Sequence, residues 1–333
     1  MDLEKLHEYI QKKWSNICQI EVLQDGDEIY HAEWNNFVQE DCVHIASATK
    51  SIISLLIGIA IDHRMIGNVN DRVLSYFPQY SVKRGEKTIS DVTIKHLLTM
   101  RAPYKGHGEP WTKVCGSDDW TKASLDFLGG KAGISDKFDY KTVCLHILSG
   151  ILSKATGMKT VDFANEYLFH PLGIVKHENF YTTTAQEHKL FITDKTPRKP
   201  VWLSDLHGLA TAGYGLCISA LDMTKIAQLC LKEGEINRFQ VISSQWIDEM
   251  LSPRLVEHGF FTGSFYGYLW WIIHPEKKIY AAIGDSGNII YIDSIKRITV
   301  AISSYFQPTV HDRIGFIENV LLPAIQKYPR HLA

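Results

Sequence analysis

Ser47 and Lys50 are the residues whose types and spacing best suit covalent chemistry. They lie in Ile45-Ala46-Ser47-Ala48-Thr49-Lys50-Ser51, where a long apolar run begins. If this run is a helix, residues three apart share a face, so the hydroxyl and the amine lie side by side. A helix N-terminus disfavours an ammonium ion, and a partly desolvated Lys50 could then accept the serine proton. The pair predicts a lysine-activated serine nucleophile; the alternative is a helix-capping serine beside an exposed lysine.

Two later segments carry groups that could complete such a site. Tyr140 precedes a predicted helix over 142–156, and a phenol at a helix entrance can act as a general base or proton relay. The alternative for Tyr140 is a packed aromatic ring. Gly284-Asp285-Ser286-Gly287-Asn288 lies between two predicted strands, where backbone N–H groups can stabilise an oxyanion. The alternative for this segment is a tight β-turn.

The periodicity of the chain places strands at both ends of the sequence and helices between them. Asp25-Gly26 is typical of a hairpin between strands at 17–23 and 28–34. The other predicted elements are helices at 3–14, 47 to near Gly67, 93–100, 142–156, 161–168, 220–233, 244–251 and 310–327, and antiparallel strands at 267–273, 278–283, 289–293 and 298–305.

This order predicts an α/β (α+β) fold, in which an antiparallel sheet is flanked by N- and C-terminal helices and interrupted by an all-α insertion. We expect residues 1–46 and 208–333 to form the α/β domain and residues 47–207 the mostly helical domain. The active site is then expected in the cleft between the two domains.

The composition is that of an ordinary globular protein and excludes some functions. The chain has 333 residues, 45% of them hydrophobic, and a net charge of −2, so no basic surface for nucleic acid or anionic membranes is predicted. The apolar run at 51–61 is shorter than the roughly 20 residues of a membrane span. The N-terminus lacks an apolar signal core, which leads us to expect a cytoplasmic protein.

Metal and cofactor sites are not predicted. The six cysteines are scattered without Cys-x-x-Cys pairs, and the fifteen histidines include no His-Glu-x-x-His. This pattern argues against a zinc ribbon or a disulfide scaffold and fits a reducing compartment.

Taken in order, the segments at Ser47, Tyr140 and Asp285 resemble the three motifs of the serine β-lactamase and penicillin-binding-protein superfamily. The class C group, with its D,D-peptidases, esterases and 6-aminohexanoate-dimer hydrolases, is the most similar branch, and the resemblance covers nearly the whole chain. It implies a β-lactamase/transpeptidase-like fold. The roles it implies are Ser47 as acylated nucleophile, Lys50 as proton partner, Tyr140 as base or relay, Asp285, Ser286 and Gly287 as third motif, and the N–H groups of Ser47 and Asn288 as oxyanion hole.

Two positions depart from the superfamily pattern. Thr142 stands where an asparagine is usual, and its hydroxyl is shorter than an amide, although it can still bond to Lys50. Asp285 stands where a lysine or histidine helps to hold a substrate carboxylate. Two like charges 4 Å apart cost about 4 kcal/mol at an effective dielectric near 20. We therefore expect poor activity on penicillins, cephalosporins and D-Ala-D-Ala peptides.

The sequence as a whole predicts a metal-free serine hydrolase that needs no cofactor and acts on a small-molecule amide or ester. It gives no indication of the oligomeric state. One alternative is a transacylase that uses the same acyl-enzyme. Another is a catalytically weak binding or sensor module of the same fold, which the departures at Thr142 and Asp285 favour and the retained Ser47, Lys50 and Tyr140 disfavour.

Overall fold

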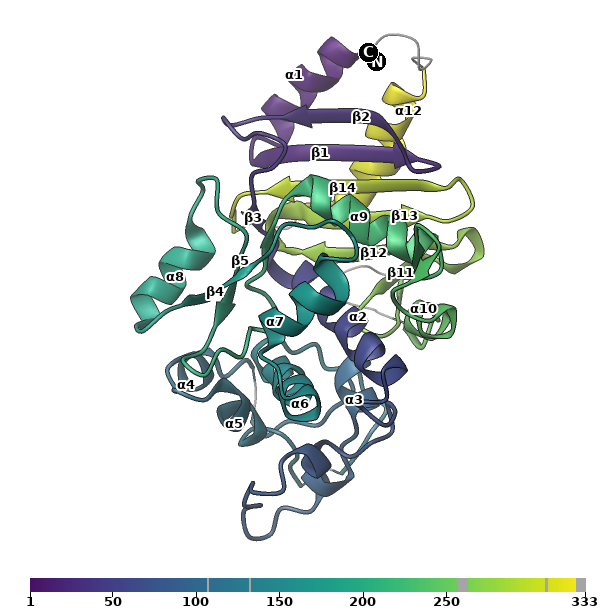
Figure 1. Cartoon of the computed structure of the whole chain (residues 1–333). Helices are drawn as coiled ribbons and strands as arrows, with labels where there is room; N and C mark the ends of the chain where they lie inside the picture. Colours follow the sequence, from purple (N-terminus) through teal and green to yellow (C-terminus); the bar gives the residue numbers. More distant parts are fainter. Residues whose placement is uncertain (107, 132, 257–262, 309–310, 328–333) are drawn as a thin grey trace.

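One antiparallel sheet of eight strands joins the two ends of the chain (Figure 1). The computed structural model describes residues 1–106, 108–131, 133–256, 263–308 and 311–327. The strand order is β2-β1-β14-β13-β12-β11-β10-β9. The strands are β1 (Ile17–Gln24), β2 (Asp27–Glu33), β9 (Leu255–Val256), β10 (Phe265–Tyr266), β11 (Trp271–His274), β12 (Ile279–Gly284), β13 (Asn288–Asp293) and β14 (Ile298–Ser304). The predicted pairing of N- and C-terminal strands in one sheet is confirmed.

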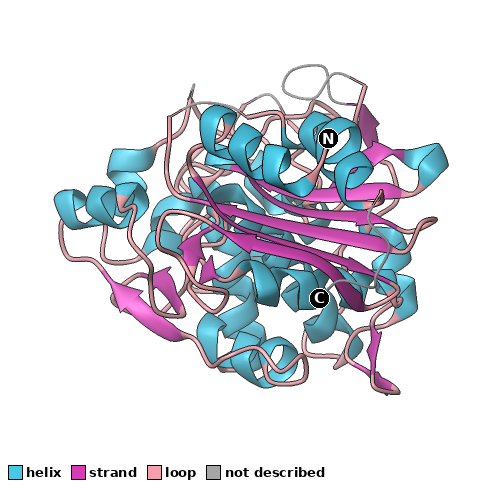
Figure 2. Ribbon diagram, turned by 90° about the horizontal axis from the view of Figure 1, so that it is seen from above, coloured by secondary structure: helices cyan, strands magenta, loops and turns pink. Residues whose placement is uncertain are grey.

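The centre of the sheet is buried on both faces. Every residue of β13 and β14 is buried, because helices cover both sides of these strands (Figure 2). Helix α9 (Ala220–Leu231) packs on β1, β13 and β14, and α1 (Leu3–Lys13) packs against α12 (Leu322–Ile325). The hairpin between β1 and β2 turns at Asp25 and Gly26, whose φ angles of 55° and 94° are both left-handed, as a two-residue turn requires.

Helix α2 (Thr49–Asp62) forms the core of the other half of the molecule. Its residues from Thr49 to Ala60 are all buried, as expected for a helix that is apolar on every side. It packs against α6 (His146–Thr156). The prediction that this helix runs to near Gly67 is wrong. It ends at Asp62, and Arg64, with a φ of 58°, takes the left-handed position after it.

Segments outside the predicted elements hold short helices over 111–115, 120–125 and 185–193, whereas the helices over 94–98, 160–164 and 244–250 match predicted ones. The remaining helices are α3 (Ile94–Leu98), α4 (Trp111–Cys115), α5 (Trp120–Leu125), α7 (Thr160–Ala164), α8 (Ala185–Thr193), α10 (Ser244–Met250) and α11 (Arg313–Phe316), with 3₁₀ or π segments at Ala46–Ala48, Val73–Tyr76, Thr88–Asp91, Val143–Leu145, Asn165–Phe169, Pro275–Lys277, Asp285–Gly287 and Ile317–Leu321. Small two-stranded sheets pair β3 (Val43–His44) with β6 (Cys217–Ile218), β4 (Glu178–Tyr181) with β5 (Val201–Ser204), and β7 (Glu235–Ile236) with β8 (Phe239–Gln240).

Candidate active site

Ser47 lies on a 3₁₀ turn, Ala46–Ala48, that links β3 to α2. Ala46 has a φ of 48°, an uncommon conformation for a residue with a side chain. Backbone strain of this kind costs about 1–3 kcal/mol and persists only where the surroundings hold it. The Ile45 N–H donates to the carbonyl of Leu216 at 3.0 Å, which ties the turn to the chain just before β6. The predicted helical run is therefore present, with its first turn tightened to 3₁₀.

The Lys50 side chain lies in the protein interior and points to Ser47. The residue is 1% exposed, and its Nζ lies 2.7 Å from Ser47 Oγ. The same nitrogen is 2.9 Å from the carbonyl oxygen of Gly213 and 3.3 Å from Thr142 Oγ1. The side-by-side arrangement that the spacing predicts is therefore observed, and three oxygen atoms fix the position of the amine.

The electrostatic surroundings of Lys50 favour a neutral amine. Burial lowers the pKa of Lys50 from its ordinary value of 10.5 to about 7, because the interior solvates an ammonium ion poorly. The charges of Glu109 and Asp285 act in the opposite direction and raise this pKa. A lysine that titrates near neutral pH can act both as proton acceptor and as proton donor.

Tyr140 lies beside the pair among aromatic rings. Lys50 Nζ is 4.7 Å from the centre of its ring, and the Trp271 ring stacks on it with centres 6.2 Å apart. Tyr266 and Phe138 surround it further, with ring centres 6.3 Å from that of Tyr140. Burial raises the pKa of the Tyr140 phenol, and a hydrogen bond with Ser47 opposes this. The phenol therefore stays protonated at neutral pH and lies against the Ser47 hydroxyl.

Thr142 is held in place from the loop before α4. The carboxylate of Glu109 accepts the backbone N–H of Thr142 at 2.5 Å and that of Val143 at 3.2 Å. Sequence reasoning missed Glu109, because no spacing rule links a loop glutamate to a segment 33 residues later. It also missed Gly213, where a side chain would collide with the carbonyl of Thr142.

The third predicted segment reaches the site through its first residues. Gly284, the last residue of β12, packs so closely on the carbonyl of Ile45 that a side chain there would collide with it. Asp285 follows and is exposed, and its charge raises the pKa of Lys50. The end of β12 and the turn of Ser47 are therefore neighbours.

The side chains of Ser286 and Asn288 belong to the turn itself. Ser286 Oγ donates to the carbonyl of Gln307 at 2.9 Å and accepts the Gln307 N–H at 2.8 Å. Asn288 Nδ2 donates to the carbonyl of Asp285 at 2.9 Å, and Asn288 Oδ1 accepts the Ser304 N–H at 2.9 Å.

This arrangement corrects the role expected of the Asn288 backbone. Its N–H donates to the carbonyl of Asp285 and closes the turn, so in this structure it is not open to an oxyanion. Gly287 lies against the guanidinium of Arg313, whose Nε donates to the Gly287 carbonyl at 3.2 Å. Among the third-motif residues, only Asp285 is exposed.

The family model for beta-lactamase matches residues 18–321. The chain belongs to the beta-lactamase family. It is 22% identical over 315 residues to the 6-aminohexanoate-dimer hydrolase of Paenarthrobacter ureafaciens, an alignment that covers 89% of this chain and 74% of that protein. The family thus includes a hydrolase that is similar to this chain over most of its length, and the chain belongs to a family of β-lactamase-fold hydrolases.

Solved structures of the beta-lactamase family share this fold at low sequence identity. The octameric penicillin-binding protein homologue from Pyrococcus abyssi superposes with a TM-score of 0.72 and 21% identity, over 97% of this chain and 78% of that one. EstCE1, described as a hydrolase with promiscuous acyltransferase activity, superposes with a TM-score of 0.67 and 14% identity, over 90% of this chain and 92% of that one. At these identities the likeness concerns the fold alone.

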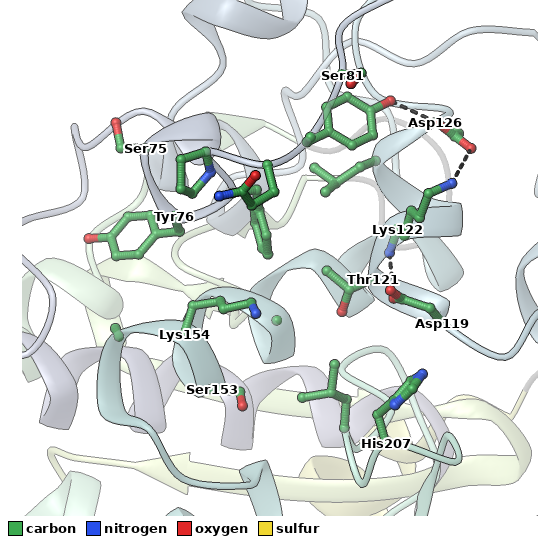
Figure 3. A pocket seen from close by; sticks show the side chains of 18 of the residues that line it. Ser75, Tyr76, Ser81, Asp119, Thr121, Lys122, Asp126, Ser153, Lys154 and His207 are labelled. Carbon is green, nitrogen blue, oxygen red and sulfur yellow. Dashed lines mark hydrogen bonds and ion pairs between the residues drawn. The ribbon is translucent and has the colours of Figure 1, made fainter.

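A cavity of about 1070 Å³ lies apart from these residues, between the segment 75–83 and helices α5 and α6 (Figure 3). Neither Ser47 nor Lys50 lines it. Its acidic groups already have partners, since Asp126 accepts the Tyr80 hydroxyl at 2.8 Å and pairs with Lys122 at 3.8 Å. The candidate active site around Ser47 and Lys50 therefore lies outside that cavity.

No helix within the described residues is both long and apolar enough to cross a bilayer. In the same part of the chain, no cluster of three or more histidine, cysteine or acidic side chains is arranged to hold a metal ion. The division into domains at residues 46 and 207 stays a prediction.

Proposed function

We propose that this protein is a serine hydrolase of the class C β-lactamase-like type, which cleaves an amide or ester through an acyl-enzyme on Ser47. The observation that carries the proposal is the 2.7 Å contact between Ser47 Oγ and a Lys50 amine that is 1% exposed. A serine that only caps a helix needs no buried amine beside it. Burying a lysine amine costs free energy, and such groups are concentrated at functional sites.

Lys50 is the better candidate for the resting base. Burial lowers its pKa to about 7, whereas burial raises the pKa of Tyr140. A neutral amine has two N–H groups and one lone pair. If the two N–H groups donate to the carbonyl of Gly213 and to Thr142 Oγ1, the lone pair faces the hydroxyl of Ser47.

The reaction then has two steps. Ser47 Oγ attacks the substrate carbonyl carbon while its proton passes to Lys50. The carbon–heteroatom bond breaks, and the leaving amine or alcohol takes a proton relayed from Lys50 through the Tyr140 phenol. In the second step water attacks the Ser47 ester and gives a proton to the same pair. The pair returns this proton to Ser47 Oγ as the bond between the acyl carbon and Oγ breaks, which releases the acid and restores the enzyme.

We place the oxyanion hole at the backbone N–H groups of Ser47 and Asp285. The support is the packing of Gly284 on Ile45, which makes the Asp285 N–H the first one beyond the strand end beside the nucleophile. The Asn288 N–H, by contrast, is used within the turn. A preorganised donor of this kind contributes about 3 kcal/mol of transition-state stabilisation.

Neutral or cationic substrates suit the charges of this site better than carboxylates do. Asp285 and Glu109 both act on Lys50 as negative charges. Arg101 and Lys105, two cations that could otherwise hold a substrate carboxylate, are already paired, Arg101 with Asp136 at 3.3 Å and Lys105 with Glu86 at 3.4 Å. We therefore propose that the protein is not an efficient β-lactamase.

A second candidate is acyl transfer from the same acyl-enzyme to an amine or alcohol. EstCE1, which shares the fold, is described as having promiscuous acyltransferase activity. A third is a binding or sensor module, motivated by Thr142 and Asp285 in place of the usual Asn and cation. An acceptor that raises turnover without raising hydrolysis would favour transfer, and a Ser47 adduct that is never released would favour a sensor.

Intact-protein mass spectrometry tests the proposal. The wild type, Ser47→Ala and the control Ser81→Ala, which changes an exposed serine, are incubated separately with a fluorophosphonate, p-nitrophenyl acetate and benzylpenicillin. We expect one fluorophosphonate adduct and release of p-nitrophenol in the wild type and Ser81→Ala, both lost in Ser47→Ala, and little benzylpenicillin adduct. No adduct from any reagent would refute the proposal, and rapid penicillin turnover would refute its substrate class.

A further inference from the structure

Glu109 is tied to the start of the helical segment that carries Thr142. Its two carboxylate oxygens accept the N–H groups of Thr142 and Val143, which open the 3₁₀ turn Val143–Leu145 and then α6. The first N–H groups of a helix have no partner within it, so a carboxylate there fixes the helix start. Glu109 therefore determines where the backbone of Thr142 lies.

The position of Thr142 is passed on to Lys50. Thr142 Oγ1 is one of the three oxygen atoms around Lys50 Nζ, at 3.3 Å. On its other side, the Thr142 carbonyl packs where Gly213 has no side chain, and the Gly213 carbonyl accepts from Lys50 at 2.9 Å. A shift of Thr142 would therefore disturb two of the three contacts of the amine.

The loop that carries Glu109 is shaped to reach this point. Gly106 and Gly108 have φ angles of 83° and 75°, which suit glycine, and Pro110 then leads into α4. Trp111, the first residue of α4, packs its ring edge-on against Tyr214, with centres 5.2 Å apart. The loop thus rests on the residue next to Gly213, and Glu109 connects it to the other side of the site.

The charge of Glu109 also acts on the amine. The groups that face Lys50 are the anions Glu109 and Asp285, the Tyr140 ring, and His146 on α6. Tyr140 and His146 are neutral near pH 7, because burial raises the pKa of the first and lowers that of the second to about 3. The two carboxylates are therefore the groups that oppose the effect of burial on Lys50.

We propose that Glu109 is a positioning residue for acyl transfer, which clamps the Thr142 end of the site and places a fixed negative charge near Lys50. The inference rests on the proposed function, because it gives Glu109 a role only if Lys50 is the base. In this role Glu109 differs from a residue that only caps a helix in one respect. Removal of its charge should change the pH dependence of the reaction as well as its rate.

The test is the pH profile of kcat/KM for p-nitrophenyl acetate in the wild type, Glu109→Gln, Glu109→Asp and Glu109→Ala. The neutral amine is the active form, so activity rises with pH through the pKa of Lys50. Loss of the carboxylate charge lowers this pKa, so the acidic limb of Glu109→Gln should move to lower pH, by about half to one unit. Glu109→Asp keeps the charge and should keep the limb, with a reduced rate.

Glu109→Ala should lose both the clamp and the charge, with a fall in kcat on the order of 10- to 100-fold, as expected when reacting groups are misplaced. Asp118→Asn is the matched control, because it removes one charge from an exposed residue of the segment that follows α4. It should leave both limb and rate unchanged.

An unchanged acidic limb in Glu109→Gln, whether or not its rate falls, would overturn the inference and leave Glu109 as a structural cap. A limb that moves equally in Asp118→Asn would also overturn it. These outcomes are distinct from failure of the proposed function, in which the wild type forms no adduct on Ser47 and hydrolyses nothing.

Discussion

Lys50 combines, in one residue, the chemistry of the site and a cost in stability. The buried amine is held by Ser47, Thr142 and Gly213, and it must lose its proton to act as base. The sequence predicted three of these four residues, because Ser47 and Lys50 share a helical spacing and Tyr140-Lys141-Thr142 fills a motif position. Gly213 and Glu109 could not be predicted, because their roles depend on loops that meet only in the folded protein.

The pKa of Lys50 predicts how stability depends on pH. The folded state releases this proton near pH 7, and the unfolded chain near 10.5. Between these values the unfolded state binds more protons, so this residue makes stability rise with pH, by up to about 1.4 kcal/mol per unit. Urea unfolding at about pH 7 and about pH 8.5 should show this rise in the wild type and much less of it in Lys50→Met.

The comparison of the wild type with Lys50→Met isolates the contribution of Lys50 to the pH dependence of stability. Both carry the same six cysteines, so thiol ionisation in the unfolded state contributes equally. If the two proteins gained the same stability over this range, Lys50 would not be the buried, neutral amine that the mechanism needs.

Asp285 is the residue at which the preference of the site for neutral or anionic substrates can be tested. It is exposed, and its charge acts on Lys50 and Tyr140, so a lysine there reverses the local charge without disturbing a buried contact. Asp285→Lys should raise the rate of Ser47 acylation by benzylpenicillin on the order of 10-fold, as expected for about 1.4 kcal/mol. Acylation by the neutral p-nitrophenyl acetate is the internal reference, and an equal gain with both reagents would argue against charge selection.

At the scale of elements, the turn between β12 and β13 shows what periodicity can and cannot predict. The short apolar runs of the sequence predicted both strands within a residue or two of their observed ends. They could not show that Ser286 has a φ of 66° and bonds to Gln307, since a turn conformation is set by contacts beyond its own sequence. For this reason the sequence predicts that the third-motif side chains belong to the site, whereas in the structure those of Ser286 and Asn288 stabilise the turn.

The Asn288 side chain should contribute strongly to the stability of this turn. It is 1% exposed and bonds to Asp285 and to both backbone groups of Ser304. Asn288→Ala leaves the Ser304 N–H and two carbonyls buried without this partner, at a cost of about 3 kcal/mol in the free energy of unfolding. Asp285→Asn, an exposed change in the same turn, should cost less than about 0.5 kcal/mol. Equal losses in chemical denaturation would contradict this account.

At the scale of the whole molecule, the two ends of the chain together support the turn Asp285–Gly287 between β12 and β13. β1 pairs with β14 along its whole length, an arrangement that the strands at both ends of the sequence predicted. The sequence did not reveal the contacts that follow. Asn16 Nδ2 donates to the carbonyl of Ser286 at 2.7 Å, and Arg313 donates to Asn16 Oδ1 at 3.1 Å.

Asn16→Ala should therefore reduce activity from a distance. The asparagine is fully buried, and its removal leaves the Ser286 carbonyl and one Arg313 N–H without their partner. We expect a loss of about 2–3 kcal/mol in stability, and a fall in kcat larger than any change in KM, because the turn positions the Asp285 N–H. Asn35→Ala is the control, since its exposed side chain bonds to the carbonyls of Ser15 and Ile17 near β1 and does not reach the turn. If Asn16→Ala lost stability but kept the wild-type kcat at a temperature where it stays folded, the turn would not depend on the chain ends, and the Asp285 N–H would have to be held by β12 alone.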